Sequence, residues 1–392
     1  MRTAIVGGGA AGFFLAINLK EAMPEMDVTI FERSNRVLAK VEISGGGRCN
    51  CTNTFEGVDD LAAAYPRGHR LLKRLFKTFD HHDAYRWFEQ HGVPLVTQPD
   101  NCVFPKAQDS HAIIDCFMAL AHRYHIKIRT HEKIQSLSQL SDYDYVAVTT
   151  GGSPRREGLQ WLADVGHAIE APVPSLFTFS ISDERLRQLK GIVVDNASVF
   201  LPATKLRASG PLLITHWGMS GPAILKLSSY AARHLADLQY HSPLSVNWVG
   251  MDEATVHDVL HETIIREPQK QATTFSPFGL SQRLWSHLLD KSLTSRATIR
   301  WGEMNKKDVN RLANILINDS YAISGRAPFK DEFVTCGGVS LSSIQPSTLE
   351  SRHVPHLFFA GEVLDIDGVT GGFNFQAAWT TAYVVAQSIL QK

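Results

Sequence analysis

The chain begins Met1-Arg-Thr-Ala-Ile-Val-Gly7-Gly-Gly9-Ala-Ala-Gly12, followed by a helical run and a second apolar run that ends at Glu32. Residues 4–6 are a short apolar run of the kind that fills a buried parallel strand. Gly7, Gly9 and Gly12 fit the G-x-G-x-x-G spacing. In such a unit the first glycine permits the tight turn, the second lets a pyrophosphate approach the backbone, and the third lets helix and strand pack closely.

Two further features complete a dinucleotide-binding unit. The helix N-terminus presents free N–H groups and the positive end of its dipole to phosphates. Glu32 follows Gly12 by 20 residues, where a carboxylate accepts hydrogen bonds from the adenosine ribose hydroxyls. A glycine-rich turn without a ligand is the alternative. The strand, helix and acid together favour a dinucleotide, and we count the adjacent Ala11 and Arg33 among the cofactor-binding residues.

Length and composition limit the class of protein. A chain of 392 residues predicts two or three domains. Lys+Arg and Asp+Glu both number 39, so the formal net charge is zero and gives no electrostatic footprint for nucleic acid or an anionic membrane. We therefore expect a small-molecule substrate and no nucleic-acid or membrane partner.

The chain is expected in the cytoplasm. The first strand begins too early for a signal peptide to precede it, and no apolar run reaches the length of a membrane helix. His257 and His261 stand at i, i+4 without a third ligand, so no metal site is expected. An odd number of scattered cysteines does not suggest a disulfide framework: Cys49, Cys51, Cys102, Cys116 and Cys336.

Residues 40–53 form a second glycine-rich stretch, KVEISGGGRCNCTN. Three consecutive glycines beside short polar residues make a backbone that folds tightly around a ligand; a flexible surface loop is the alternative. The stretch resembles the K-x-x-x-S-G-G-G-R-C-N-x-T-N signature of the BaiN/YhiN-like NAD(P)/FAD-dependent oxidoreductases. Members usually carry a glycine shortly before the lysine, where this chain has Leu38-Ala39. The predicted cofactor contacts here are Lys40, Ser44, Gly45, Gly46, Gly47, Arg48, Cys49 and Asn50.

The resemblance covers nearly the whole chain and implies a fold. It implies a Rossmann-type, glutathione-reductase-like FAD domain (α/β; residues 1–155 plus 326–392), interrupted by a β-rich domain (156–250) and a helical subdomain (251–325). The residue pattern agrees with this division of the chain. Short β-branched and aromatic runs that suggest a barrel or sandwich come first, and helical patterns follow at 254–265, 281–291 and 306–317. The resemblance also places the backbone near Ile134, in a short strand at 133–137, against adenine. It places the turn at Thr150-Gly151 beside the ribose and pyrophosphate.

The C-terminal stretch is also predicted to contact the cofactor. Residues 357–360 read as a strand, followed by Gly361 and Glu362. By resemblance this acid hydrogen-bonds a ribityl hydroxyl of FAD. Residues 365–377 open the final helix, whose N–H groups and dipole would face the flavin pyrimidine edge and stabilise negative charge there. The expected contacts are Gly371, Gly372 and Asn374, with Gln376 as a further donor.

Two segments leave alternatives open. Residues 70–92 are helical in pattern, and the cations at 70, 73, 74 and 77 are more typical of a solvated helix face than of a phosphate patch. His216 lies in a segment similar to the family's L-x-T-H-x-G-x-S-G-P-A element. It either acts as an acid or base or, more often in such places, braces a turn before a helix.

These features predict an FAD-dependent oxidoreductase. No second glycine-rich nicotinamide fold is visible in residues 155–325, so NAD(P)H either binds transiently or the substrate donates the hydride. The leading hypothesis is NAD(P)H-linked reduction of an activated double bond or carbonyl in a small or steroid-like molecule through flavin N5. The alternatives are an aminoacetone-type amine oxidase using O2, and a non-catalytic or RNA-modification flavoprotein. No catalytic side chain is assigned, since hydride transfer at flavin N5 needs orientation and exclusion of water more than a dedicated acid. A redox-active cysteine pair is disfavoured because Cys49 and Cys51 lack the C-x-x-C spacing.

Overall fold

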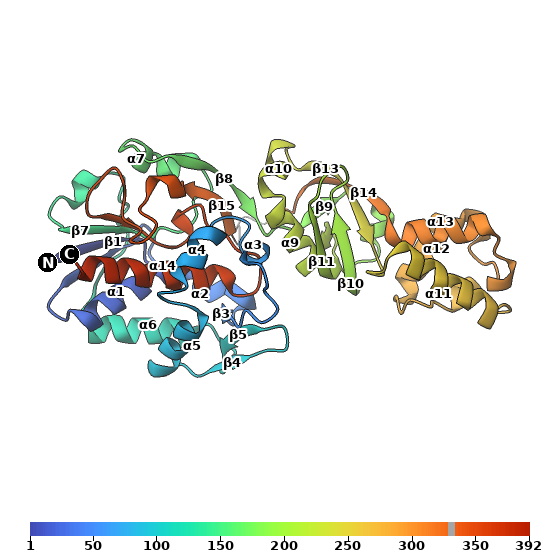
Figure 1. The fold of residues 1–392 in the computed structure, drawn as a ribbon, viewed down its shortest axis with the longest axis horizontal. Helices are drawn as coiled ribbons and strands as arrows, with labels where there is room; N and C mark the ends of the chain where they lie inside the picture. The colour runs from blue at the N-terminus through green and yellow to red at the C-terminus, as the bar shows by residue number, and fades with distance from the viewer. Residues whose placement is uncertain (328–333) are drawn as a thin grey trace. The chain divides into compact units, whose positions relative to one another are not determined.

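The computed structural model describes residues 1–327 and 334–392, which divide into two compact units (Figure 1). Unit 1 comprises residues 1–175 and 334–392, and unit 2 comprises residues 176–327. The helical segment after residue 250 belongs to the same unit as the strands before it. The three-part division expected from the sequence stays a prediction.

Unit 1 is built on a parallel sheet with the strand order β16-β7-β1-β2-β6. Its strands are β1 Arg2–Val6, β2 Asp27–Phe31, β6 Lys127–Arg129, β7 Tyr145–Val148 and β16 Leu357–Phe359. Val6 pairs with Phe31 on one side and with Val148 on the other, so three strands end at one level. In parallel α/β sheets the crevice beyond the carboxyl ends of the strands is where ligands bind.

Two long helices of unit 1, α1 (Ala10–Ala22) and α14 (Phe373–Leu390), lie side by side (Figure 1). The rings of Phe14 and Trp379 meet between them with centroids 5.3 Å apart. Both helices are apolar around most of their circumference because they are buried on several sides. The other helices are α2 Ala39–Ile43, α3 Leu61–Ala64, α4 His69–Leu75, α5 His81–Gln90, α6 His111–Arg123 and α7 Gln160–Ala163.

Two small antiparallel sheets complete unit 1. One has the order β3-β5-β4, and the other pairs β15 with β8. Their strands are β3 Thr52–Asn53, β4 Leu95–Thr97, β5 Cys102–Pro105, β8 Ile169–Ser175 and β15 Val334–Val339.

The structure corrects two expectations about unit 1. The pattern at 70–92 forms two helices: α4 ends at Leu75, and α5 begins after Asp80, whose side chain caps it by accepting from the N–H groups of His82 and Asp83. The strand expected at 133–137 is wrong. Residues 133–136 pair with no strand of the described chain, and Ser136 caps a 3₁₀ turn at Leu137–Leu140 that takes up the end of the expected segment.

Unit 2 is a closed barrel with helices packed on it. The barrel order is β10-β11-β12-β9-β14-β13. Its strands are β9 Phe179–Ile181, β10 Val193–Phe200, β11 Arg207–Ile214, β12 Gly218–Ser220, β13 His241–Asn247 and β14 Asp319–Arg326. The helices are α8 Glu184–Arg187, α9 Pro222–Tyr230, α10 Ala232–Asp237, α11 Glu253–Arg266, α12 Gln282–Leu293 and α13 Lys306–Ile317. Barrel and helices share one apolar core, which includes Trp248, Leu288 and Leu312.

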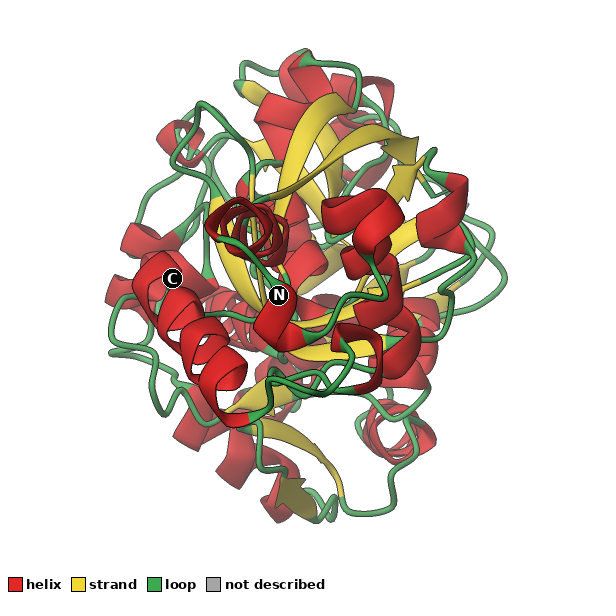
Figure 2. Ribbon diagram, turned by 90° about the vertical axis from the view of Figure 1, so that its right-hand side faces the viewer, coloured by secondary structure: helices red, strands yellow, loops and turns green. Residues whose placement is uncertain are grey.

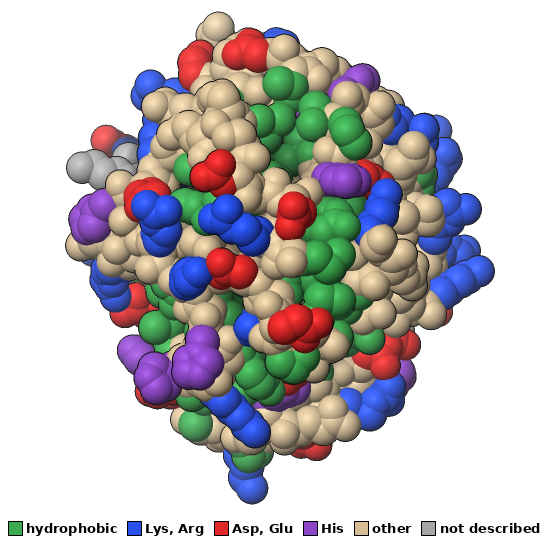
Figure 3. Space-filling model, turned by 90° about the vertical axis from the view of Figure 1, so that its left-hand side faces the viewer, with side chains coloured by type: hydrophobic (Ala, Val, Ile, Leu, Met, Phe, Trp, Pro, Cys, Tyr) green, Lys and Arg blue, Asp and Glu red, His purple; other side chains and the backbone are tan. Residues whose placement is uncertain are grey.

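The predicted fold class is confirmed: a Rossmann-type sheet occurs together with a barrel and helices (Figure 2). On the face shown in Figure 3, positive and negative side chains are mixed, as the zero net charge would suggest. Within residues 1–327 and 334–392, no helix combines the length and apolar character needed to cross a membrane.

Candidate cofactor site

The first glycine-rich turn joins β1 to α1 and leaves space at one point. A Cβ at Gly7 would lie 2.4 Å from the Thr149 carbonyl oxygen, and one at Gly12 would lie 2.1 Å from the Gly7 carbonyl oxygen. These two positions therefore need glycine for the backbone packing itself. A Cβ at Gly9 would meet no atom within 4 Å. Gly9 also caps α1 without a side-chain hydrogen bond, so the helix N-terminus opens onto the free space that a pyrophosphate requires.

Glu32 lies beside this turn at the end of β2. Its Oε2 accepts from the Gly8 N–H at 3.0 Å, and its Oε1 accepts from the Ser34 N–H at 2.8 Å. These bonds fix the carboxylate at the position predicted for the ribose acceptor. Arg33 is exposed next to it. Ile134 packs against the core cluster that includes Phe31, so it reaches the same end of the sheet although its predicted strand is absent.

The second glycine-rich stretch winds through three consecutive left-handed residues. Gly45, Gly46 and Gly47 have φ values of 56°, 69° and 83°, a conformation that favours glycine. A Cβ at Gly46 or Gly47 would meet nothing within 4 Å. Ser44 and Arg48 flank the turn, and Arg48 Nε donates to the Gly45 carbonyl at 3.2 Å. The turn thus presents open backbone rather than a packed face.

The two cysteines that follow are buried and protonated. Cys49 has no exposed surface, and burial raises the pKa of its thiol to about 12. Cys51 is equally buried, and burial raises the pKa of its thiol as well. Because the thiolate is the reactive form, neither cysteine is suited to a relay with a flavin at neutral pH.

Asn50 connects this stretch to the start of α14. With the amide turned to suit its neighbours, its oxygen accepts from the Gly372 N–H at 3.2 Å, while its nitrogen donates to the Thr52 and Val103 carbonyls at 2.9 and 3.2 Å. The side chain predicted to contact the cofactor therefore also holds the loop before α14 in place.

The carboxylate of Glu362 contacts three other segments of the chain. Its Oε2 lies 2.9 Å from the Lys40 Nζ, and its Oε1 accepts from the Thr335 N–H at 2.7 Å. A Cβ at Gly151 would lie 3.9 Å from the same carboxylate. Thr150 is exposed at the adjoining end of β7. The predicted residues of the N-terminal, central and C-terminal segments are thus brought together in unit 1.

Gly361 and the loop before α14 complete the arrangement. A Cβ at Gly361 would lie 3.1 Å from the Ala11 Cβ, so this residue touches the start of α1. Gly371 and Gly372 have φ values of 128° and 87°, and Gly372 caps α14 without a side-chain hydrogen bond. A Cβ at Gly372 would lie 2.2 Å from the Thr52 carbonyl oxygen, so the start of α14 is packed against β3, and its position at the flavin edge stays a prediction.

Two amides predicted as donors to the cofactor are used inside the protein. Asn374 donates to the Gly368 carbonyl at 2.9 Å and accepts from the Gly368 N–H at 2.8 Å. Gln376 is buried, accepts from the Thr52 hydroxyl at 2.6 Å and donates to the Thr380 hydroxyl at 3.0 Å. Asn374 therefore stabilises the loop, and a direct contact between it and the cofactor stays a prediction.

A buried ion pair in the same loop was missed by sequence reasoning. Asp367 has no exposed surface, and Arg67 Nε donates to its Oδ1 at 2.5 Å. The Ser175 hydroxyl donates to the other oxygen at 3.0 Å. Burial raises the pKa of Asp367, and Arg67 opposes that rise. Three hundred residues separate the pair, so no local spacing signals it.

The donors and acceptors gathered in unit 1 suit an extended dinucleotide such as FAD. One carboxylate stands at the end of β2 and another after β16, and open glycine backbone occurs at the α1 N-terminus and at Gly46 and Gly47. Glu32 would hold the adenosine ribose, Glu362 the ribityl chain, and the α1 N-terminus the pyrophosphate.

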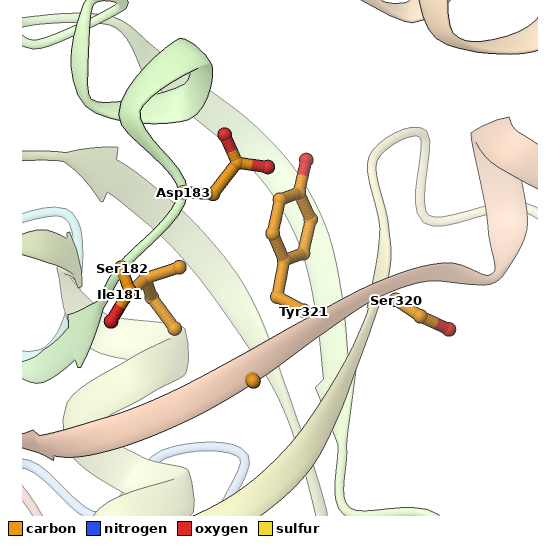
Figure 4. Close-up of a pocket in the computed structure, with 6 residues that line it drawn as sticks. Ile181, Ser182, Asp183, Ser320 and Tyr321 are labelled. Atoms are coloured by element: carbon orange, nitrogen blue, oxygen red, sulfur yellow. The ribbon is translucent and has the colours of Figure 1, made fainter.

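Unit 2 holds a separate pocket of about 370 Å³ beside the barrel (Figure 4). It is lined by Ile181, Ser182, Asp183, Ser320, Tyr321 and Ala322. Behind it, the buried carboxylate of Asp319 accepts from Tyr321 and Trp248 and pairs with Lys291. His216 lies elsewhere in the unit, exposed on the turn between β11 and β12 with its ring beside Trp217. No chemical role for His216 follows from this position.

Comparison with known proteins identifies the family. The HI0933-like protein Rossmann domain matches residues 1–388. Ribosomal RNA dihydrouridine synthase of Haemophilus influenzae is 27% identical, with 98% of this chain and 97% of that protein covered. The 3-dehydro-bile acid delta(4,6)-reductase of Clostridium scindens is 23% identical, with 100% and 99% covered. Among solved structures, 3-ketosteroid delta1-dehydrogenase from Sterolibacterium denitrificans aligns with a TM-score of 0.53 at 11% identity, covering 100% of this chain and 99% of that one, which supports the fold.

The chain therefore belongs to the HI0933-like Rossmann family, and it is an FAD-dependent flavoprotein oxidoreductase.

Proposed function

We propose that this protein reduces a carbon–carbon double bond conjugated to a carbonyl, with NAD(P)H as the electron donor. One observation carries the proposal: two full-length relatives with different names share this chemistry. The delta(4,6) double bonds of a 3-dehydro-bile acid are conjugated to the 3-ketone. The double bond that is reduced when uridine becomes dihydrouridine is conjugated to the uracil carbonyl. In both, the β-carbon is electron-poor and accepts a hydride.

The residues of unit 1 have defined tasks in such a reaction. FAD, when bound, would supply hydride chemistry for the β-carbon, with a proton from solvent for the α-carbon and NAD(P)H as the source of the two electrons. Asn50 and Asn53 hold the loop before α14, since Asn53 Nδ2 donates to the Gly371 carbonyl at 2.9 Å. The α14 N-terminus thereby keeps a fixed direction, and its dipole would favour negative charge on a ring system bound there.

The substrate class has two candidates. A small or steroid-like enone agrees with the bile-acid reductase relative. A uracil base within RNA is favoured by a different observation: the ribosomal RNA dihydrouridine synthases of H. influenzae and Escherichia coli, at 27% and 25% identity, both share more identical residues with this chain than the bile-acid reductase does at 23%. The expectation of no nucleic-acid partner, based on net charge, is therefore reopened.

Anaerobic mixing tests the proposal. The purified holoprotein is mixed with NADH or NADPH while the flavin absorption is followed, and a steroid enone or a ribosomal RNA fragment is then added. We expect the flavin bands to bleach and then to return with one substrate and not the other. Flavin that stays oxidised with both nucleotides, together with O2 consumption on a small amine, would support the amine oxidase alternative and contradict the proposal.

A further inference from the structure

The surface of α4 combines features that the cofactor site does not use. Arg70, Lys73, Arg74 and Lys77 are all exposed, while the leucines between them are buried. Arg70, Lys73 and Arg74 stand at i, i+3 and i+4 on one face of α4, and Lys77 follows in the turn after the helix ends at Leu75. We call these four residues the α4 basic face.

The α4 basic face is uncompensated. No Asp or Glu occurs between residues 61 and 79. Throughout the part of the chain that the structure describes, none of the four side chains has an ion-pair or hydrogen-bond partner. Like charges at i, i+3 and i+4 repel one another, so this arrangement costs helix stability unless an anion binds. The mixed charges in Figure 3 are the arrangement expected of an ordinary solvated face.

A half-buried aromatic cluster adjoins this face. Phe55 meets Phe76, the residue that ends α4, with ring centroids 5.5 Å apart, and it meets His81 at 4.9 Å. All three rings are partly exposed. Burial and the neighbouring His82 lower the pKa of His81, so its ring is neutral at physiological pH. Cations next to exposed rings are the combination that binds single-stranded nucleic acid, through phosphate contacts and base stacking.

The segment that leads into α4 is hydrogen-bonded to the loop and first residue of α14. The Val369 N–H donates to the Ala64 carbonyl at 2.8 Å, and the Tyr65 hydroxyl donates to the Phe373 carbonyl at 2.8 Å. A Cβ at Gly68, the residue that caps α4, would lie 2.6 Å from the Ile366 side chain, so the two segments are in close contact. The α4 basic face is therefore held beside the predicted flavin loop within unit 1.

We propose that the α4 basic face binds the phosphates of a single-stranded RNA segment and that Phe55, Phe76 and His81 stack one of its bases. This inference rests on the RNA-directed form of the proposed function. It takes up the phosphate-patch interpretation of residues 70–77, the alternative to a solvated face, because zero net charge over the whole chain does not describe a local run of cations.

Two triple variants of the holoprotein test the proposal. One is Arg70→Gln/Lys73→Gln/Lys77→Gln. The matched control, Lys306→Gln/Lys307→Gln/Arg311→Gln, removes the same charge from exposed positions on α13. Fluorescence anisotropy with a uridine-rich single-stranded RNA oligonucleotide gives the affinity at several salt concentrations. Flavin content and flavin reduction by nicotinamide are measured in parallel.

We expect the α4 variant to bind RNA at least tenfold more weakly than wild type. Its salt dependence should be shallower by about 2 in log–log slope, at about 0.7 for each phosphate that the variant no longer neutralises. The control should bind like wild type, and flavin content and reduction should be unchanged in both. Phe55→Leu should weaken binding about tenfold with little change in the salt slope.

Equal RNA binding by the two triple variants would overturn the proposal, as would wild-type protein that binds no RNA. Loss of binding to anionic lipid vesicles without loss of RNA binding would assign the face to a membrane instead and would also overturn it. Reduction of a steroid enone by the same preparations reports separately on the proposed redox function, so the two ideas can fail independently.

Discussion

The ammonium of Lys40 lies 2.9 Å from the carboxylate of Glu362, although 322 residues separate them in the chain. The contact joins the two segments with the most specific sequence signals. Glu362 is fixed further by the Thr335 N–H at 2.7 Å, so its orientation is set before a ligand arrives. A preoriented carboxylate accepts a ligand hydroxyl with little loss of side-chain entropy.

Replacing this carboxylate should weaken FAD binding. Glu362→Gln keeps the size of the side chain but removes the charge, and a hydrogen bond to a charged group contributes about 1.5–3 kcal/mol. We expect the dissociation constant for FAD to rise roughly 10- to 100-fold, measured by flavin fluorescence after dilution. Glu350→Gln, which removes an acid that pairs with Lys392, is the control and should leave the affinity unchanged. Equal affinity in Glu362→Gln would refute the ribityl role.

The glycines of the first turn should separate folding from cofactor binding. Gly9→Ala adds a methyl group that meets no protein atom within 4 Å, so the free energy of unfolding of the apoprotein should change by less than about 0.5 kcal/mol. FAD affinity should nevertheless fall at least tenfold, because that methyl occupies the pyrophosphate position. Gly12→Ala places its Cβ 2.1 Å from a backbone oxygen and should destabilise the apoprotein itself by ~1–3 kcal/mol.

Denaturant unfolding of both apoproteins, followed by FAD titration, checks this pair. A Gly9→Ala protein that binds FAD like wild type would show that the open space at this turn does not hold the pyrophosphate.

Cys49 should be dispensable for redox chemistry and should affect stability at alkaline pH. Its thiol pKa is raised from 9.0 to about 12 in the folded protein, so between these values the folded state retains a proton that the unfolded state loses. The stabilising contribution is present below pH 9 and is lost as the pH rises toward 12. The slope is about 1.4 kcal/mol per pH unit for one group. Cys49→Ala should reduce this slope and leave flavin reduction by nicotinamide intact.

Urea unfolding between pH 8 and pH 10.5, with alkylation of the native protein by iodoacetamide, gives the measurement. Rapid labelling of Cys49 at neutral pH, or loss of flavin reduction in Cys49→Ala, would restore the cysteine relay that the sequence disfavours.

Local signals explain what the sequence predicted well. The positions of β1, α1 and Glu32 follow from a strand, a turn and a helix that are contiguous in the chain. The G-G-G run at residues 45–47 likewise permits a tight backbone turn, and the structure shows positive φ at all three positions.

Contacts between distant segments explain what it missed. The sequence predicts Asn374 as a donor to the cofactor because it lies in the first turn of α14. In the structure its amide instead forms two hydrogen bonds with the backbone N–H and carbonyl of Gly368. Ion pairing of Arg70 depends on which acidic side chains lie near α4 in the folded protein. The net charge of the chain does not contain that information. The inertness of Cys49 was expected from its spacing to Cys51, whereas burial of both thiols is the physical cause.

The ion pair of Arg67 with Asp367 should show how strongly the loop before α14 depends on a buried charge. The carboxylate has no exposed surface and the Arg67 side chain is 12% exposed. Arg67→Met should destabilise the protein by about 3–5 kcal/mol at neutral pH, because it leaves a buried carboxylate without its cation. Arg67→Met/Asp367→Asn should recover much of this loss, because no buried charge then remains.

The pH dependence gives a second readout with a defined sign. Burial already raises the pKa of Asp367, and removing Arg67 takes away the group that opposes this rise. In Arg67→Met the folded protein therefore favours the protonated acid. Its stability should be highest at acidic pH and should fall as the pH rises through the folded-state pKa, while the double variant lacks this dependence. Denaturant midpoints measured from pH 4 to pH 8 decide the matter: parallel profiles for the single and double variants would mean that Asp367 is not the group that responds, and that Arg67 acts through its packing alone.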